Sequence, residues 1–180
     1  MDAIIIAVAG GNDVIMSDNR TITRTALLLA LTLIFQSLRF FIPLPPFLST
    51  FLIGSLVNAS LLIATEKIGL WSALVIAVVT PVVAYFQQLL PLPVFIIPVA
   101  LGNTAYVCLF LFAGRQRPAL RVALATLGKS GLLYVLFAWL LTFIAISPKL
   151  AAGIMLAMSW PQLVTGAIGG FIAFLITKRI

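Results

Sequence analysis

Six long apolar stretches follow one another along this chain, each containing about the 20 residues that a helix needs to cross a membrane. The chain of 180 residues is 63% hydrophobic and only 8% charged, whereas a water-facing surface needs roughly a quarter of its residues charged. Lipid is therefore the solvent for most of this protein, and we predict an all-α integral membrane protein. The predicted spans are 22–41, 47–65, 69–89, 94–113, 119–146 and 152–177.

Basic residues between the spans predict how the six transmembrane helices are oriented. If the N-terminus is cytoplasmic, the outer side holds only Arg39 and Lys149. The inner side then holds Arg20, Arg24, Lys67, Arg115, Arg117, Arg121, Lys178 and Arg179. Because basic residues are enriched in cytoplasmic loops, we predict that both termini are cytoplasmic. The net charge of +7 follows from the same bias, so it needs no nucleic-acid partner.

The scarcity of reactive side chains limits the chemistry that this chain can perform. It has no histidine, one cysteine and four acidic residues, and every acidic residue except Glu66 precedes the first span. Most metal sites, histidine-based catalysis and paired-carboxylate catalysis are thereby disfavoured. We expect no enzymatic activity and no cofactor. A proton- or sodium-coupled carrier is also disfavoured, because intramembrane carboxylates usually carry that coupling.

The first residues, MDAIIIAVAGGNDVI, hold an apolar run that is too short to span a membrane and lacks the basic start of a signal peptide. Met16 opens a more usual beginning for a membrane protein. We expect residues 1–15 to be either a mis-called start or a loose segment, and residues 16–180 to form a single six-helix transmembrane domain.

Two proline-rich segments resemble each other and fall on the predicted outer side. IPLPPFLSTFLIGS and LPLPVFIIPVALGN, which begin at Ile42 and Leu90, share two prolines, a leucine, a phenylalanine and a glycine in register. The match indicates either parallel hairpin repeats, as in many transporters, or two turns that use proline independently. Proline fixes the backbone, so both loops should be stiff, and they form either a lid over a pocket or simple tight turns.

Polar side chains within the apolar stretches gather toward the predicted outer side. Such groups are costly in lipid and normally face other helices or water. We therefore predict a substrate-binding site on that side. Its candidate residues are Gln36, Arg39, Gln87, Asn103, Tyr106, Lys129, Tyr134, Trp160 and Gln162.

Lys129 lies roughly 15 Å from the inner end of its span at helical rise. A buried lysine there needs an anion, a cluster of carbonyls or water, and Glu66 is a partner only if the two depths overlap. Alternatively, Lys129 extends to the inner surface along its flexible side chain. Arg39 likewise either contacts a ligand or anchors its helix at the membrane interface.

Small residues predict two close helix contacts. Ala26 and Ala30 form an AxxxA pair on the first span, whose shallow surface would let another helix approach. Gly166 and Gly170 form a GxxxG pair on the last span, which indicates tight packing either within the chain or between two copies.

With six spans, both ends inside and the AxxxA pair on the first helix, residues 16–180 resemble the substrate-binding S components of energy-coupling factor (ECF) transporters. The resemblance implies an S-component-like bundle in the plasma membrane that captures a vitamin or related micronutrient from the outer side. It also implies that Ala26 and Ala30 dock on a transmembrane coupling subunit, itself bound to two cytoplasmic ATPase subunits. The chain has no P-loop, so ATP hydrolysis would come from these partners.

The remaining alternative is a non-transporting scaffold subunit of the membrane, such as those of the cell-shape machinery. A scaffold predicts no small-molecule binding and no use for the outer amides. Within the S-component reading, the absence of histidine argues against capture of nickel or cobalt, because the family takes these metals with nitrogen ligands near the N-terminus.

Overall fold

A computed structural model describes residues 2–42, 45–114 and 118–179, with the backbone alone for residues 2–17 and Pro46. These residues are helical and contain no strand, so the all-α prediction is confirmed. Five described segments are long and apolar enough to cross a membrane, and α3 is a shorter apolar helix. The elements are α1 (Asp2–Phe41), α2 (Pro46–Lys67), α3 (Leu70–Phe86), the 3-10 turn η1 (Pro93–Phe95), α4 (Ile96–Phe112), α5 (Pro118–Leu140), α6 (Pro148–Ala157) and α7 (Trp160–Thr177).

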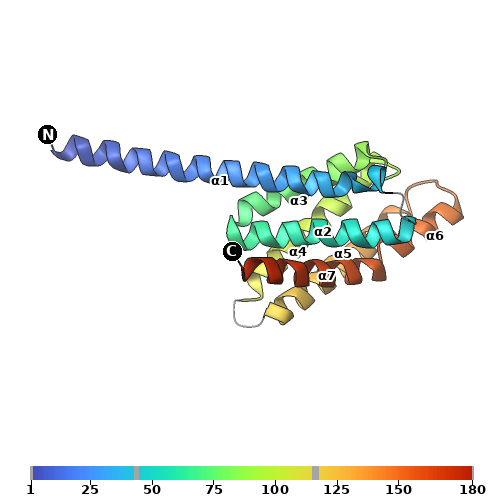
Figure 1. The fold of residues 1–180 in the computed structure, drawn as a ribbon. Coiled ribbons are helices and arrows are strands. Elements are labelled where there is room, and N and C mark those ends of the chain that lie inside the picture. Colours follow the sequence, from blue (N-terminus) through green and yellow to red (C-terminus); the bar gives the residue numbers. More distant parts are fainter. Residues whose placement is uncertain (1, 43–44, 115–117, 180) are drawn as a thin grey trace.

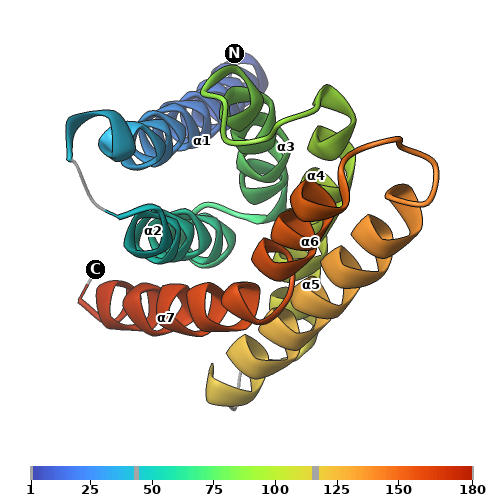
Figure 2. The same ribbon diagram turned by 90° about the vertical axis from the view of Figure 1, so that its right-hand side faces the viewer.

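The long helices run up and down along one axis, and both chain ends lie at the same end of the bundle (Figure 1). The α2–α3 connection, the C-terminal end of α4 and the N-terminal end of α5 lie at that end, while α6 and the connections around it lie at the other. With the orientation predicted from loop charges, the end with the termini is cytoplasmic. Viewed along the axis, α2 and α7 lie side by side, and α6 lies over α4 and α5 (Figure 2).

The helix ends differ from the predicted spans at two places. The fifth helix ends at Leu140 instead of residue 146, because the chain turns before Ser147 caps α6 by accepting a hydrogen bond from the Leu150 N–H at 3.4 Å. The sixth predicted span is two helices that break around Ser159. Pro161 explains the break, since it has no N–H to continue the helical hydrogen bonds of α6 and its ring clashes with the carbonyl four residues earlier, whereas it fits the first turn of α7.

The first predicted span corresponds to the C-terminal part of α1, which continues N-terminally to Asp2 (Figure 1). That residues 1–15 are a loose segment or a mis-called start stays a prediction, which the intact mass of the natively expressed protein would test. Pro43 and Leu44 of the first proline-rich segment lie outside the described residues. The internal repeat therefore also stays a prediction.

The glycines of α7 pack against helices of the same chain. A side-chain carbon added at Gly166 would lie 2.7 Å from Thr126, and one added at Gly170 would collide with Val122, both on α5. One added at Gly169 would lie 2.8 Å from the backbone oxygen of Ser55 on α2. The predicted tight packing thus joins α7 to its neighbours within the bundle, with no second copy required.

An ion pair joins three helices in the half of the bundle that contains the termini. The Arg121 guanidinium on α5 donates to a Glu66 carboxylate oxygen on α2 at 2.8 Å and, through Nε, to the backbone oxygen of Phe110 on α4 at 3.1 Å. It also lies 3.9 Å from the centre of the Phe110 ring. Here a buried cation has its carboxylate, a carbonyl and an aromatic face.

Candidate functional site

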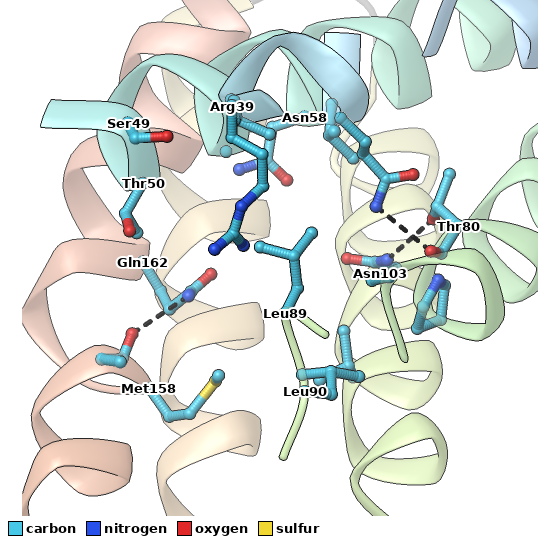
Figure 3. Close-up of a pocket in the computed structure, with 18 of the residues that line it drawn as sticks. Arg39, Ser49, Thr50, Asn58, Thr80, Leu89, Leu90, Asn103, Met158 and Gln162 are labelled. Atoms are coloured by element: carbon cyan, nitrogen blue, oxygen red, sulfur yellow. Dashed lines mark hydrogen bonds between the residues drawn. The ribbon is translucent and has the colours of Figure 1, made fainter. Parts of the chain in front are cut away.

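A cavity of about 370 Å³ lies in the half of the bundle opposite the termini (Figure 3). Its wall comes from α1 to α5, the segment after α3, and the junction of α6 with α7. Apolar side chains such as Ile53, Leu90 and Met158 line part of it. The polar lining residues are Gln36, Arg39, Ser49, Thr50, Asn58, Thr80, Asn103, Lys129 and Gln162.

The lining residues lie at two depths, judged from their positions along the helices. Asn58, Asn103 and Lys129 lie near the middles of α2, α4 and α5 and form the floor. Arg39 and Thr50 lie close to the outer ends of α1 and α2. At 1.5 Å per residue, the floor is on the order of 15 Å below the outer helix ends, close to mid-membrane.

Lys129 is held at the floor by two amide oxygens from different helices. Its ammonium donates to Oδ1 of Asn58 at 2.6 Å and to Oδ1 of Asn103 at 2.8 Å. The Tyr106 ring centre lies 5.3 Å from Nζ, within the range of a cation–π contact. The lysine is only 5% exposed, so it is fixed in the bundle and does not extend to the inner surface.

The asparagines are themselves oriented by further hydrogen bonds. Asn58 donates through Nδ2 to the Thr165 hydroxyl on α7 at 3.3 Å, and Asn103 donates to the backbone oxygen of Ala77 on α3 at 3.3 Å. The Ala77 oxygen is free to accept because Pro81, one helical turn later, has no N–H to bond it. A proline within α3 therefore supplies an acceptor that turns the Asn103 oxygen toward Lys129.

Gln36 lines the cavity from α1 and is 5% exposed. Its Nε2 donates to the backbone oxygen of Thr80 at 3.2 Å, while its Oε1 has no hydrogen-bond partner in the described part of the chain. Thr80 also lies 3.5 Å, through its hydroxyl, from Nδ2 of Asn103. A continuous polar path thus runs from Gln36 through Thr80 and Asn103 to Lys129.

Arg39 and Gln162 approach the cavity from opposite walls. Figure 3 shows the Arg39 guanidinium extending into the space between Gln162 and Leu89. Gln162 donates through Nε2 to the backbone oxygen of Ala157 at 3.1 Å, so it bridges the break between α6 and α7. No carboxylate within the described ranges forms a salt bridge with Arg39.

Comparison with protein families matches residues 20–180 to the ECF transporter substrate-specific component. This match covers all the helices described above except the first part of α1. The chain belongs to the substrate-specific (S) components of ECF transporters. The S component is a membrane subunit of a transporter and not an enzyme, and it resides in the plasma membrane. No curated protein and no solved structure matches the chain.

The structure brings some of the S component's candidate binding residues together and places others elsewhere. Gln36, Arg39, Asn103, Lys129 and Gln162 all line the cavity. The remaining four candidates, Gln87, Tyr106, Tyr134 and Trp160, are not among its lining residues. Which of the nine contact substrate stays a prediction.

Those four residues have other surroundings. Gln87 donates to the Ser37 hydroxyl at 2.9 Å and so joins the end of α3 to α1. Tyr106 is fully buried, and its hydroxyl donates to the backbone oxygen of Gly166 at 2.7 Å. Tyr134 is 51% exposed on α5, and Trp160 packs against Phe47 and Phe51, with ring centres 6.0 and 5.7 Å away.

Two suggestions for Lys129 are wrong. Glu66 is not its partner, because Glu66 bonds Arg121, which lies two helical turns nearer the inner end of α5. Lys129 also does not extend to the inner surface, because its ammonium is buried and bonded to two asparagines. Of the partners expected for a buried lysine, the structure contains the cluster of carbonyls, which the side-chain amide oxygens of Asn58 and Asn103 form.

Sequence reasoning omitted Asn58, Thr80 and Thr50 from the candidate site, although all three line the cavity of the S component. Asn58 lies about as far from the outer end of α2 as Lys129 does from the outer end of α5, and matching depths would have paired them. The sequence signal in this part of α3 was Pro81, which leaves the backbone oxygen of Ala77, one turn earlier, without its helical donor.

The alanine pair of the S component is accessible. Ala26 and Ala30 are both exposed on the side of α1 that faces away from the bundle, and the neighbouring Leu27 is 67% exposed. α1 packs against α2 and α3 through its other side. This face can receive another helix without any rearrangement of the bundle.

Proposed function

We propose that this S component captures a vitamin or related micronutrient from the outer side of the membrane and delivers it to an ATP-driven ECF importer. The observation that carries the proposal is the cavity. It combines a buried polar floor with apolar walls, as small-molecule sites commonly do, and it lies at the end of the bundle opposite the basic loops.

The outer location follows from the loop charges. Arg20, Arg24, Lys67 and Lys178 belong to the end that contains the termini, which the positive-inside rule assigns to the cytoplasm. The cavity is then entered from outside, beneath the segments that follow α3 and α5. Leu89 and Leu90 of the segment after α3 already line it.

Delivery would use the accessible alanine face of α1. In this proposal Ala26 and Ala30 contact a transmembrane coupling subunit, and two cytoplasmic ATPase subunits drive the movement that turns the cavity inward. Small side chains let helix backbones approach closely and slide, since no large side chain must be displaced. Substrate capture and energy coupling would therefore use separate surfaces of one chain.

Thermal unfolding of the purified full chain in detergent, against a panel of vitamins and related micronutrients, tests capture directly. A compound that binds only the folded form raises stability by RT ln(1 + [L]/Kd), about 2.7 kcal/mol at one hundred times Kd. We expect one compound in the panel to raise the melting temperature by several degrees. A scaffold subunit would show no shift with any compound.

Uptake into vesicles tests delivery. The S component, reconstituted with a coupling subunit and two ATPases, should accumulate the stabilising compound only when ATP is present on the ATPase side. Vesicles that lack the S component, and vesicles whose ATPases carry an inactivated P-loop, are the matched controls. Uptake without ATP would contradict the proposal.

A further inference from the structure

The cavity contains cationic groups without an acidic residue to balance them. Lys129 lies at its floor and Arg39 at its outer wall, and none of the described lining residues is Asp or Glu. Glu66, the acidic residue on a neighbouring helix, is already bonded to Arg121. A buried ammonium away from water needs an opposite charge close by, because neutral oxygens solvate it only in part.

The hydrogen bonds of the floor leave specific positions open. An ammonium has three donors, and Lys129 uses two of them on the oxygens of Asn58 and Asn103. The Nδ2 group of Asn103 donates to two acceptors, the Ala77 and Thr80 oxygens, whereas that of Asn58 donates to Thr165 and keeps a second N–H. The third N–H of Lys129 is the charged donor that remains to meet an anionic oxygen.

The second open position is an acceptor. Oε1 of Gln36 is buried, lines the cavity and has no partner within the described ranges of the chain. A buried acceptor without a donor costs about 1–3 kcal/mol, a cost that a ligand donor would remove. Because Gln36 and Asn103 both bond Thr80, this acceptor and Lys129 belong to the same part of the cavity.

We propose, on the basis of the capture function above, that the substrate is a compact carboxylic acid that also carries a hydroxyl or N–H donor. Its carboxylate accepts the third N–H of Lys129 and supplies the missing negative charge. Its donor reaches Oε1 of Gln36, and its apolar body packs against side chains such as Leu90 and Met158. Arg39 attracts the anion at the outer end of the cavity.

The size and charge of the cavity narrow this class further. A volume of about 370 Å³ is near the lower end of the roughly 300–1,000 Å³ range of ligand sites, so a compact acid fits better than a large conjugate. A phosphate ester would bring about two negative charges and three strong acceptor oxygens. The single open donor of Lys129 matches one carboxylate more closely.

Matched pairs of an acid and its neutral counterpart test the proposal on the purified full chain in detergent. The probes are pantothenate with panthenol, and biotin with biotinamide, since both acids also carry a hydroxyl or N–H donor. We expect one acid to raise the melting temperature and to bind at least 50-fold more tightly than its neutral counterpart. The wild-type comparison needs no variant, so it remains decisive even if a cavity variant fails to fold.

Variants then assign the discrimination to the cavity. Lys129→Met should remove most of the preference for the acid, and Gln36→Met should weaken binding of the same acid about tenfold. Lys149→Met is the matched control, because Lys149 is an exposed lysine on the outer helix α6, and it should leave both affinities unchanged. Full retention of the preference in Lys129→Met would overturn the role of this lysine.

The outcomes separate this inference from the capture function. Equal binding of an acid and its neutral counterpart, or binding of riboflavin or pyridoxine with no acid bound, would support capture and overturn the carboxylate class. Binding of no vitamin at all would contradict the capture function and the inference together. Tight binding of one acid with exclusion of its neutral counterpart would support both.

Discussion

Helix α5 carries two buried cations that have very different partners. Arg121, in the half of the bundle with the termini, has the carboxylate of Glu66, the carbonyl of Phe110 and the Phe110 ring. Lys129, two turns further along the same helix, donates to two neutral amide oxygens and lines the cavity. The first cation is neutralised within the chain, and the second is not.

This difference separates a structural half from a binding half. Around Arg121 the bundle is closed by small residues and by glycines of α7 that bring the backbones together. Around Lys129 the helices enclose a cavity of about 370 Å³. A buried charge with all of its partners in place stabilises one arrangement of the chain. A buried charge that lacks a counter-ion can instead be stabilised by a ligand of opposite charge, and this interaction then contributes to binding.

The largest effect should come from changing the surface of the structural half. Ala26→Trp combined with Ala30→Trp places two large side chains on the exposed face of α1, where a partner helix could no longer approach closely. We expect ATP-driven uptake into vesicles to fall at least tenfold, while the Kd for the substrate changes by less than about twofold. Radiolabelled uptake and thermal shift on the same preparation measure the two quantities.

Val135→Trp is the control for this change, because Val135 is 62% exposed on α5 and distant in the sequence from the alanine pair. It should alter neither uptake nor binding. If the double tryptophan variant lost substrate binding along with uptake, the two surfaces would not be independent and the comparison of the two halves would fail.

The next largest effect is a loss of stability on removing the carboxylate that pairs with Arg121. Glu66→Ala leaves the Arg121 guanidinium buried without its carboxylate. Breaking a fully buried pair costs about 3–5 kcal/mol, and the Glu66 side chain is 27% exposed, so we expect a loss of about 2–3 kcal/mol in unfolding free energy. Equilibrium unfolding in detergent measures the loss, and substrate affinity should not change.

Two further variants sharpen this prediction. The double variant Glu66→Ala with Arg121→Met removes both charges and should recover part of the lost stability. Lys129→Met should cost less than Glu66→Ala, because it leaves no unpaired charge, and the oxygens of Asn58 and Asn103 that lose its ammonium line the cavity, where water can donate to them. A larger loss in Lys129→Met would make Lys129 a structural cation and would remove the distinction between the two halves.

The sequence was sufficient to predict the helical bundle, because membrane spans are determined by the length and polarity of whole segments. It could not place the break at Ser159, where apolar residues continue on both sides and the local effect of Pro161 decides. The end of the fifth span at Leu140 was missed for the same reason, since the residues of the following turn are also apolar. Segment hydropathy does not resolve where an apolar chain bends.

The candidate site was predictable in part. Lys129, Asn103 and Gln36 were identified because a polar group in lipid needs a partner. Tyr134 and Trp160 were assigned to the same site, but they lie half exposed on the bundle surface. Nearly every neighbour in such helices is apolar, so the sequence does not define which face turns inward, and amphipathic aromatics are tolerated on either face. Pro81 indicates that the oxygen of Ala77 is free, but that Asn103 bonds this oxygen and that Gln36 and Asn103 meet at Thr80 is known only from the coordinates.

The smallest effect tests the boundary between the two halves, where Tyr106 lies. Its hydroxyl donates to the Gly166 backbone oxygen at 2.7 Å, and its ring lies 5.3 Å from the Lys129 ammonium. Tyr106→Phe removes the hydroxyl and keeps the ring. The Gly166 oxygen is within α7, where it also accepts the helical hydrogen bond from a residue one turn later, so it is not left without a donor. We therefore expect a loss of only about 1 kcal/mol in unfolding free energy.

Substrate affinity should change by less than about twofold in Tyr106→Phe, because the aromatic face beneath Lys129 is preserved. Tyr106→Leu is the matched variant: it removes both the hydroxyl and the ring, so it should lower stability further and also weaken binding of an acid. Calorimetric titration with the stabilising compound would compare the two variants. If the phenylalanine variant lost affinity as strongly as the leucine variant, the hydroxyl would belong to the binding half, and the boundary would lie deeper in the bundle than Lys129.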